Sequence, residues 1–145
     1  MIVSTKGRYA LRVMIDLAAR GEGRYVPLTE IAARQEISEK YLESILVVLS
    51  RAGYLQALRG KGGGYRLARK PEDYTAEEIV RLCEGTLAPV GCMKDGECCD
   101  RADCCPTRPM WEGLDRTIND YLRRYPDNLE RVYETLSYFD TMNMA

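Results

Sequence analysis

Five of the six cysteines in this 145-residue chain fall within fourteen residues, and the chain contains no histidine. Cys92 comes first, and two adjacent doublets follow at Cys98–Cys99 and Cys104–Cys105. Thiolates ligate zinc and iron–sulfur clusters, and they also carry out redox chemistry. The cysteine-rich segment is therefore a candidate metal or cluster site, a thiol switch or a disulfide-linked loop.

The spacing of these cysteines argues against disulfides within a doublet. Consecutive Cα atoms lie only about 3.8 Å apart, whereas a disulfide usually needs about 4.4 to 6.8 Å between its Cα atoms. Zinc sites usually pair cysteines two to four residues apart, and the gaps here depart from that pattern. The N-terminus has no signal-peptide pattern, so we expect a cytoplasmic protein whose thiols stay reduced. Ligation, or exchange between the doublets, is favoured.

The two halves of the chain carry opposite net charges. Residues 1–70 contain 13 Lys and Arg against 6 Asp and Glu, while residues 71–145 contain 8 against 16. A basic half suits a polyanionic partner such as DNA, and an acidic half limits non-specific binding. No apolar run approaches the roughly 18 residues that a membrane span needs, so we expect no membrane partner.

Residues 1–70 have the periodicity of three helices. Apolar residues recur every three or four positions over residues 5–20, where Thr5 is the expected N-cap. A short helix is expected over residues 28–36, and a longer one begins after the N-cap Ser38. Two helices joined by a tight turn, the second of them longer, are typical of a helix-turn-helix.

A β-hairpin is expected directly after these helices. Strand-like runs at residues 54–59 and 65–68 flank a tip with four glycines, which let the chain reverse. A hairpin in this position is a wing, and Arg59, Lys61 and Arg66 are expected at its end. The predicted fold is mainly α with a small β-hairpin, a winged helix-turn-helix.

The glycine-rich tip does not have the sequence of a phosphate-binding loop. Its sequence, GKGGGY, matches neither G-x-x-x-x-G-K-[ST] nor G-x-G-x-x-G, and it lies in a hairpin rather than between a strand and a helix. The chain also lacks histidine and the G-x-S-x-G elbow of many hydrolases. We therefore predict that this protein is not an enzyme.

The start of the longer helix and the wing carry groups suited to DNA. Lys40 can bind guanine acceptors or phosphate, Glu43 can accept from cytosine, and serine hydroxyls can donate to either. Arg59 suits a narrow minor groove, where negative potential is concentrated. An ordinary helical hairpin with solvated charges is the alternative. The candidate DNA-binding residues are Ser38, Lys40, Tyr41, Glu43, Ser44, Arg59 and Lys61.

Two further helices are expected on either side of the cysteines. Thr75 and Glu78 form a capping box for a helix that ends at Gly85, with Cys83 on its apolar face in a packing role. A helix of about 17 residues begins near Pro109, and Pro126 separates it from a last amphipathic helix. The apolar face of the helix that begins near Pro109 is formed by Trp111, Leu114, Ile118 and Leu122.

Four stretches together resemble a family of winged-helix regulators: STKGRYALRVMIDLA, ISEKYLESI, RGKGGGYRLAR and CDRADCCPTRPMW. That family includes the iron–sulfur cluster regulator, the nitric-oxide-sensing repressor and the cysteine-metabolism repressor. The resemblance extends to about Leu122 and implies a bacterial homodimer on a pseudo-palindromic operator in double-stranded DNA. The implied domains are the winged helix-turn-helix at 1–70, a connecting helix at 71–90, the cysteine-rich loop at 91–108 and dimerisation helices at 109–145.

The resemblance also implies metal ligands. In cluster-binding members, three cysteines of this loop hold a two- or four-iron cluster, and the matching positions are Cys92, Cys99 and Cys105. Cys98 and Cys104 are the alternates: the gap from Cys92 to Cys99 is one residue longer than in the iron–sulfur cluster regulator, and Cys92, Cys98 and Cys104 would restore its x5, x5 spacing. Arg108 stands where the iron–sulfur cluster regulator has a histidine ligand, and arginine cannot ligate. A fourth ligand would then be a doublet cysteine, a partner-subunit group or one of Asp95, Asp100 and Asp103.

The sequence leaves two alternatives open for the cysteines. A family member without a cluster would sense through thiol oxidation, zinc or a bound partner protein, as the cysteine-metabolism repressor does with its partner enzyme. A dithiol redox or metal-handling protein comes from another functional class. It has no C-x-x-C beside a βαβ pattern, and it leaves the basic wing without a role.

Overall fold

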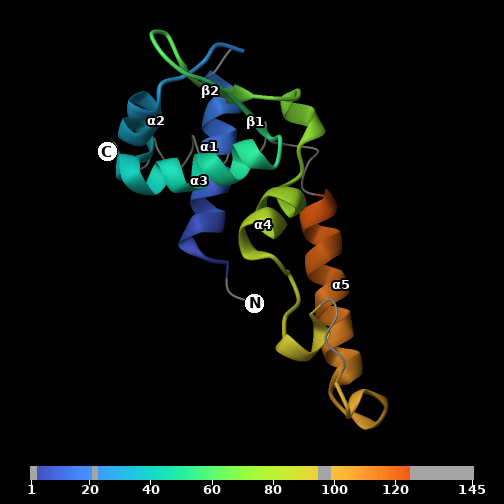
Figure 1. Cartoon of the computed structure of the whole chain (residues 1–145). Helices are drawn as coiled ribbons and strands as arrows, with labels where there is room; N and C mark the ends of the chain where they lie inside the picture. The colour runs from blue at the N-terminus through green and yellow to red at the C-terminus, as the bar shows by residue number, and fades with distance from the viewer. Residues whose placement is uncertain (1–2, 21–22, 95–98, 125–145) are drawn as a thin grey trace, which may run out of the picture.

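The computed structural model describes residues 3–20, 23–94 and 99–124, and it confirms a mainly helical fold with one antiparallel hairpin (Figure 1). No helix in these ranges is long and apolar enough to cross a membrane. The elements in chain order are α1 (Thr5–Arg20), α2 (Leu28–Gln35), α3 (Glu39–Arg51), β1 (Leu55–Leu58), β2 (Gly64–Leu67), α4 (Ala76–Glu84) and α5 (Arg108–Arg124).

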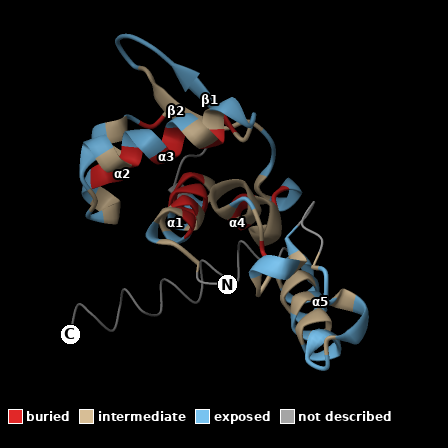
Figure 2. Cartoon of the chain, turned by 60° about the horizontal axis from the view of Figure 1, so that its bottom comes forward, coloured by how far each residue is buried: buried red, intermediate tan, exposed pale blue. Residues whose placement is uncertain are grey.

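The core lies where α1, α2, α3 and α4 face one another, as the buried residues in Figure 2 show. Each fully buried Leu or Ile contributes about 1.5–3 kcal/mol relative to leaving it exposed. This apolar packing fixes α3 against α1 and leaves the opposite face of α3 in solvent. The completely buried members on the first three helices are Ala10, Val13, Met14, Ile31, Leu42, Ile45, Leu46 and Leu49.

The N-terminus of α1 is bonded to the C-terminus of α4. The prediction that Thr5 caps α1 is wrong, because Ser4 Oγ accepts from the Gly7 N–H at 3.3 Å. Ser4 also donates from its N–H and its hydroxyl to Glu84 Oε1, at 3.1 and 2.7 Å. A carboxylate from 80 residues away therefore helps to satisfy the first turn of α1.

A buried ion pair joins α1 to α2. Asp16 is 5% exposed and accepts from Arg34 Nε at 2.9 Å and from Arg34 Nη2 at 2.6 Å. Arg34 also pairs with Glu30, one turn earlier on α2. The helix-turn-helix is thus fixed to α1 by charge as well as by apolar packing.

The hairpin pairs Leu55 with Leu67 and Leu58 with Gly64. Val26, in the segment before α2, adds an isolated bridge to Tyr65, with N–H to O distances of 2.9 and 2.8 Å. Gly64 has a φ of 153°, and a Cβ there would lie 2.2 Å from the Val26 carbonyl oxygen. Only glycine allows the wing to lie this close to that segment.

The predicted capping box of α4 is present: the Glu78 N–H donates to Thr75 Oγ1 at 3.1 Å, and the Thr75 N–H reaches Glu78 Oε1 at 3.4 Å. After α4 the chain runs away from the wing through the cysteine loop and returns along α5, so the loop lies at the far end of the molecule (Figure 1). Helix α5 begins at Arg108, one residue before the predicted start.

Helix α5 buries none of its side chains within the single chain. On its predicted apolar face, Trp111, Ile118 and Leu122 are half-buried and Leu114 is exposed. The last helix predicted by the sequence lies outside the described residues. The apolar face of α5 is therefore available for a second protein surface.

Candidate nucleic-acid interface and cysteine pocket

The N-terminal half of α3 presents most of the predicted contact residues to solvent. Ser38 is the N-cap and accepts from the Tyr41 N–H at 3.3 Å, which fixes where the helix starts. The Ser44 hydroxyl donates to the Tyr41 carbonyl at 2.6 Å. Lys40 and Glu43 are exposed, as are both serines. Because three buried leucines and Ile45 hold the other face of α3 against the core, these groups point away from the core.

Tyr41 differs from its neighbours because it is half-buried and packs against the core. Its ring meets Tyr9 of α1 edge to face, with centroids 6.0 Å apart. The Arg12 guanidinium lies 5.2 Å from the centroid of the same Tyr9 ring. These contacts belong to the winged helix-turn-helix, which we call the head. Tyr41 is thus held in place from behind, and its contact with DNA stays a prediction.

The wing carries Arg59 and Lys61 at its exposed tip, where Figure 1 shows the loop projecting above the helices. Leu58, 48% exposed beside them, adds an apolar group that the sequence analysis did not single out. Arg66 is not at the end of the wing as predicted. It lies within β2, donates to Gln56 Oε1 at 2.8 Å and has its guanidinium 4.6 Å from the centroid of the Tyr25 ring.

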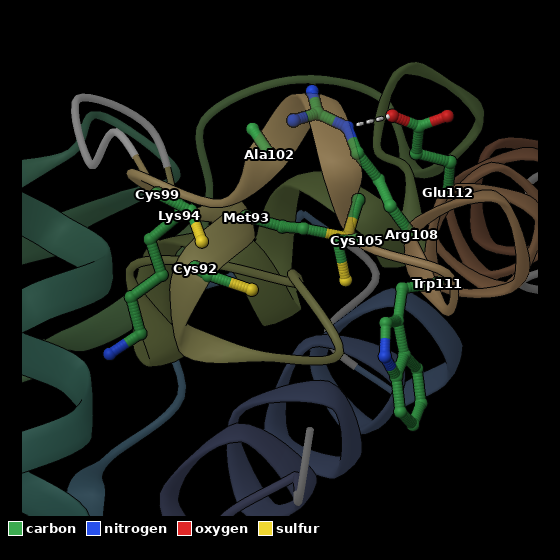
Figure 3. Close-up of a pocket in the computed structure, with 9 residues that line it drawn as sticks. All are labelled: Cys92, Met93, Lys94, Cys99, Ala102, Cys105, Arg108, Trp111 and Glu112. Atoms are coloured by element: carbon green, nitrogen blue, oxygen red, sulfur yellow. Dashed lines mark hydrogen bonds and ion pairs between the residues drawn. The ribbon is translucent and has the colours of Figure 1, made fainter.

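Three of the predicted metal ligands open onto one pocket of about 240 Å³ (Figure 3). Cys92 comes from a short 3₁₀ turn, Gly91–Met93, and Cys105 follows another, Ala102–Cys104. Helix α5 closes the pocket with its first turns. The lining residues are Cys92, Met93, Lys94, Cys99, Ala102, Cys105, Arg108, Trp111 and Glu112.

The two members of the second doublet face different surroundings. Cys105 lines the pocket, whereas Cys104 is exposed, lies 3.6 Å from the Arg101 carbonyl oxygen and is absent from the described lining residues. Cys98, the other alternate, lies outside the described residues. Among the described cysteines of the loop, Cys92, Cys99 and Cys105 therefore line the pocket, and the alternate Cys104 does not.

Cys105 and Cys83 are perturbed in opposite directions. Hydrogen bonds from the Thr107 side chain, with Oγ1 3.4 Å from Sγ, and from the Thr107 backbone lower the pKa of the Cys105 thiol. The backbone N–H and the charge of Arg108 act in the same direction. Burial raises the pKa of Cys83, which is half-buried against the core. The predicted packing role of Cys83 is confirmed. The lowered pKa of Cys105 makes its thiolate, the form that ligation and redox chemistry need, easier to form.

Residues 3–134 match the model of the Rrf2 family, described as an iron-dependent transcriptional regulator. The chain belongs to the Rrf2 family. It is 39% identical over 135 residues to the transcriptional regulator CymR of Bacillus subtilis, covering 92% of this chain and 97% of the relative. It is 38% identical over 128 residues to IscR of Cereibacter sphaeroides, covering 86% and 83%.

The fold agrees with that membership. The solved structure of CymR, the global cysteine regulator of B. subtilis, superimposes with a TM-score of 0.69 at 35% identity and covers 84% of this chain and 89% of that one. The Rrf2 protein is a transcription regulator and not an enzyme, which rules out the dithiol oxidoreductase alternative. It acts on DNA in the bacterial cytoplasm.

The lining of the cysteine pocket bears on which kind of metal group this Rrf2 protein could hold. In the described part of the chain, no group of three or more Cys, His, Asp or Glu side chains is arranged to hold one metal ion. Structural zinc needs four ligands about 2.0 to 2.3 Å from one centre, whereas a cluster distributes its ligands over several irons. Cys92, Cys99 and Cys105 line the pocket together with Lys94 and Arg108, whose positive charges would offset the negative charge of thiolate ligands.

The sequence analysis missed one carboxylate at this pocket. Glu112 lines the pocket and accepts from Arg108 Nε at 2.6 Å. Two of the predicted candidates for a fourth ligand, Asp100 and Asp103, are exposed and do not line the pocket, and Asp95 lies outside the described residues. The i, i+4 spacing from Arg108 placed Glu112 on the same helix face and was the available signal.

Proposed function

We propose that this Rrf2 regulator is a homodimer that senses iron–sulfur status, redox conditions or nitric oxide through a cysteine-ligated iron–sulfur cluster. The observation that carries the proposal is the pocket shared by Cys92, Cys99 and Cys105 at the start of α5. This pocket adjoins the helix whose exposed apolar face suits a partner subunit. Ligand state and subunit arrangement are thereby linked at one place in the molecule.

DNA recognition is assigned to the exposed N-terminal face of α3 and to the wing. Lys40, Glu43, Ser38 and Ser44 would meet base edges and phosphates in the major groove, with Tyr41 packed beside them. Arg59 and Lys61 would contact the adjacent minor groove or backbone. In a dimer the two half-sites lie about 34–36 Å apart, one helical turn of a pseudo-palindromic operator.

Dimerisation is assigned to α5. Met110, Leu114 and Tyr121 are 56%, 42% and 62% exposed on this helix, and three half-buried apolar residues lie among them. A helix with this pattern needs a partner surface to remove its apolar face from water. Pairing of α5 with its copy would supply that surface and would place two winged heads side by side.

The cluster is assigned to Cys92, Cys99 and Cys105. When bound, it supplies a redox-active centre that responds to iron, sulfide and nitric oxide. Each ligating thiol must lose its proton, and the hydrogen bonds at Cys105 already favour the thiolate. Arg108 cannot ligate, so we add Glu112 to the candidates for the fourth position.

Regulation follows if the loaded and empty pockets prefer different arrangements of the two heads. The difference in the free energy of DNA binding between the two forms then cannot exceed that preference. The pocket is formed by both the loop and the first turns of α5, so occupancy would bear directly on the direction of α5 relative to the head.

The testing experiment is the ultraviolet–visible spectrum of protein purified without oxygen, with iron, sulfide and zinc determined on the same sample. We expect brown protein with matching iron and sulfide. Cys92→Ser, Cys99→Ser and Cys105→Ser should each lose the colour, whereas Cys104→Ser should keep it. Cys83→Ser controls for a thiol that packs against the core. If Cys104→Ser loses the colour and Cys105→Ser keeps it, the ligand set is wrong.

A cluster-free regulator is the second candidate. It is favoured by the match to CymR, which covers 97% of that relative's length. Sensing would then pass through oxidation of the Cys105 thiolate, through zinc or through a partner protein. Colourless protein without iron that still retards operator DNA would support this candidate over the cluster. Zinc in the same sample would distinguish the zinc form from the metal-free form.

A further inference from the structure

The base of the wing is held by a buried phenol. Tyr74 is 1% exposed and lies two residues before α4. Its hydroxyl donates to the Tyr54 carbonyl at 2.7 Å and accepts from the N–H groups of Ala68 and Arg69 at 3.0 and 2.8 Å. A phenol has one donor and two acceptor lone pairs, so these three bonds use its full capacity. Because Tyr54 precedes β1 and Ala68 follows β2, one oxygen binds both strands of the wing.

Arg69 attaches the same place to α4. Its Nη2 donates to Glu78 Oε1 at 2.8 Å and its Nη1 to the Asp73 carbonyl at 3.1 Å. The guanidinium lies 4.3 Å from the ring centroid of Tyr74 and 5.1 Å from that of Tyr54. Glu78 is also the capping-box residue of α4. The base of the wing and the first turn of α4 are therefore one bonded unit, which we call the wing clamp (Tyr54, Ala68, Arg69, Tyr74 and Glu78).

The direction of the wing is sensitive to this clamp because the tip is far from it. Each strand has four residues, which at about 3.3 Å per residue puts the tip about 13 Å from the base. The Val26–Tyr65 bridge holds the hairpin from the other side, so the clamp and the bridge together set the direction of the wing. If loss of the clamp tilts the base by about 10°, the tip moves by roughly 2 Å. Hydrogen bonds need donor–acceptor distances of about 2.7–3.2 Å, so such a displacement removes a contact made by Arg59.

We propose that Tyr74 is a positioning residue for DNA binding, whose hydroxyl, together with Arg69, sets the direction of the wing so that Arg59 reaches the DNA. This inference rests on the proposed DNA-binding role of the wing. The inference predicts that loss of the Tyr74 hydroxyl weakens DNA binding because the contact made by Arg59 is lost, while the fold as a whole is unchanged.

The test is a double-mutant cycle between Tyr74→Phe and Arg59→Ala. The probe is a duplex selected by the wild-type protein from a pool with about 30 randomised base pairs, enough for two half-sites one turn apart. Binding is followed by fluorescence anisotropy. We expect Arg59→Ala to weaken binding by about tenfold and Tyr74→Phe by about fivefold, but Tyr74→Phe in the Arg59→Ala background by less than about twofold.

Tyr54→Phe is the matched control, because Tyr54 contributes its carbonyl and its ring to the clamp and the variant keeps both. It should bind like the wild type. Circular dichroism and sizing establish that each variant is folded with an unchanged oligomeric state. If Tyr74→Phe does not fold, Arg69→Gln replaces it, because the Arg69 side chain is 39% exposed. The same non-additivity with Arg59→Ala is expected.

Two results would overturn the positioning role. One is wild-type affinity in folded Tyr74→Phe. The other is a loss in the Arg59→Ala background as large as in the wild type, which would mean that the clamp acts apart from the wing tip. A wild-type protein that selects no duplex would instead refute the proposed DNA-binding function itself. Selection of a duplex by the wild-type protein therefore distinguishes failure of the positioning role from failure of the DNA-binding function.

Discussion

Removal of Asp16 should destabilise the head more than removal of any exposed ion pair. Asp16 is almost fully buried on α1 and accepts a two-pronged contact from Arg34 of α2, with Nε at 2.9 Å and Nη2 at 2.6 Å. The Arg34 side chain is only 18% exposed. Asp16→Ala therefore leaves a largely buried guanidinium without its main partner.

The magnitude follows from this geometry. Removing one member of a buried ion pair costs about 3–5 kcal/mol, and we expect the lower end because Arg34 keeps Glu30 as a second partner. For a chain of this length, about 3 kcal/mol corresponds to a fall in Tm of roughly 6–12 °C. Arg24→Ala, which breaks an exposed pair with Glu30, should cost less than about 1 kcal/mol.

The assay is thermal unfolding followed by circular dichroism, with all variants at one concentration because the proposed dimerisation would make the apparent Tm depend on concentration. The double variant Asp16→Ala, Arg34→Met removes both charges and should recover part of the loss. A Tm of Asp16→Ala within about 2 °C of the wild type would refute the reasoning. Equal losses in Asp16→Ala and Arg24→Ala would refute it as well.

Three further outcomes are expected. Leu114→Asp should elute as a monomer on sizing, and a persistent dimer would place the interface away from α5. If the heads contact six to ten phosphates, operator affinity should fall by about 10³ to 10⁵ between 50 and 200 mM salt, and a flat response would contradict DNA binding. Hydrogen bonds from Arg24 and Arg34 lower the pKa of Glu30 from 4.5 to about 2. This stabilisation is present above about pH 4.5 and is lost as pH falls towards 2, so Glu30→Gln should flatten the acid limb of the Tm–pH curve. Equal acid limbs in the variant and the wild type would rule out that contribution.

Local signals predicted the parts of the fold that depend on neighbours in sequence. The Ser38 N-cap and the Thr75–Glu78 capping box both act over three residues, and both are present. The N-cap of α1 is Ser4 rather than the neighbouring Thr5, and Ser4 is additionally held by Glu84, a contact 80 residues away that local signals do not encode. The three bonds of the Tyr74 hydroxyl likewise join segments that periodicity does not relate. Propensity indicates which residues form a helix, but topology decides which helix ends meet.

At the cysteine site, too, the sequence predicts some features and only the structure shows the others. The sequence restricted the candidate ligands to a short segment but did not choose between the two cysteines of each doublet. In the structure Cys104 ends a 3₁₀ turn and is exposed, while the next residue, Cys105, lines the pocket. The backbone of that turn decides which thiol faces inward, and the spacing of cysteines does not encode it. Glu112 was within reach of sequence reasoning, because i, i+4 positions share a helix face.

The acidity of the second half of the chain has a structural cause beyond solubility. Helix α4 has nine residues and carries three glutamates that bind three different parts of the molecule. Glu78 holds the base of the wing through Arg69, and Glu84 holds the start of α1 through Ser4. Burial alone would raise the pKa of Glu77, but hydrogen bonds from Arg123 of α5 and from Arg81 outweigh it and lower the pKa.

These contacts make α4 the described element that links α5 to the base of the wing, so the proposed coupling between the cysteine pocket and the wing would pass through α4. The cysteine pocket lies at the end of the molecule away from the wing, so no described contact joins them directly. Arg81 adds a bond to Asn119 of α5 at 2.7 Å, which fixes α5 along α4 at a second point. A change in the direction of α5 would therefore either move α4, and with it the wing clamp, or break the bonds of Glu77 to Arg123 and of Arg81 to Asn119. The first route would transmit the state of the pocket to Arg59, and under the second the winged helix-turn-helix would not respond to the pocket.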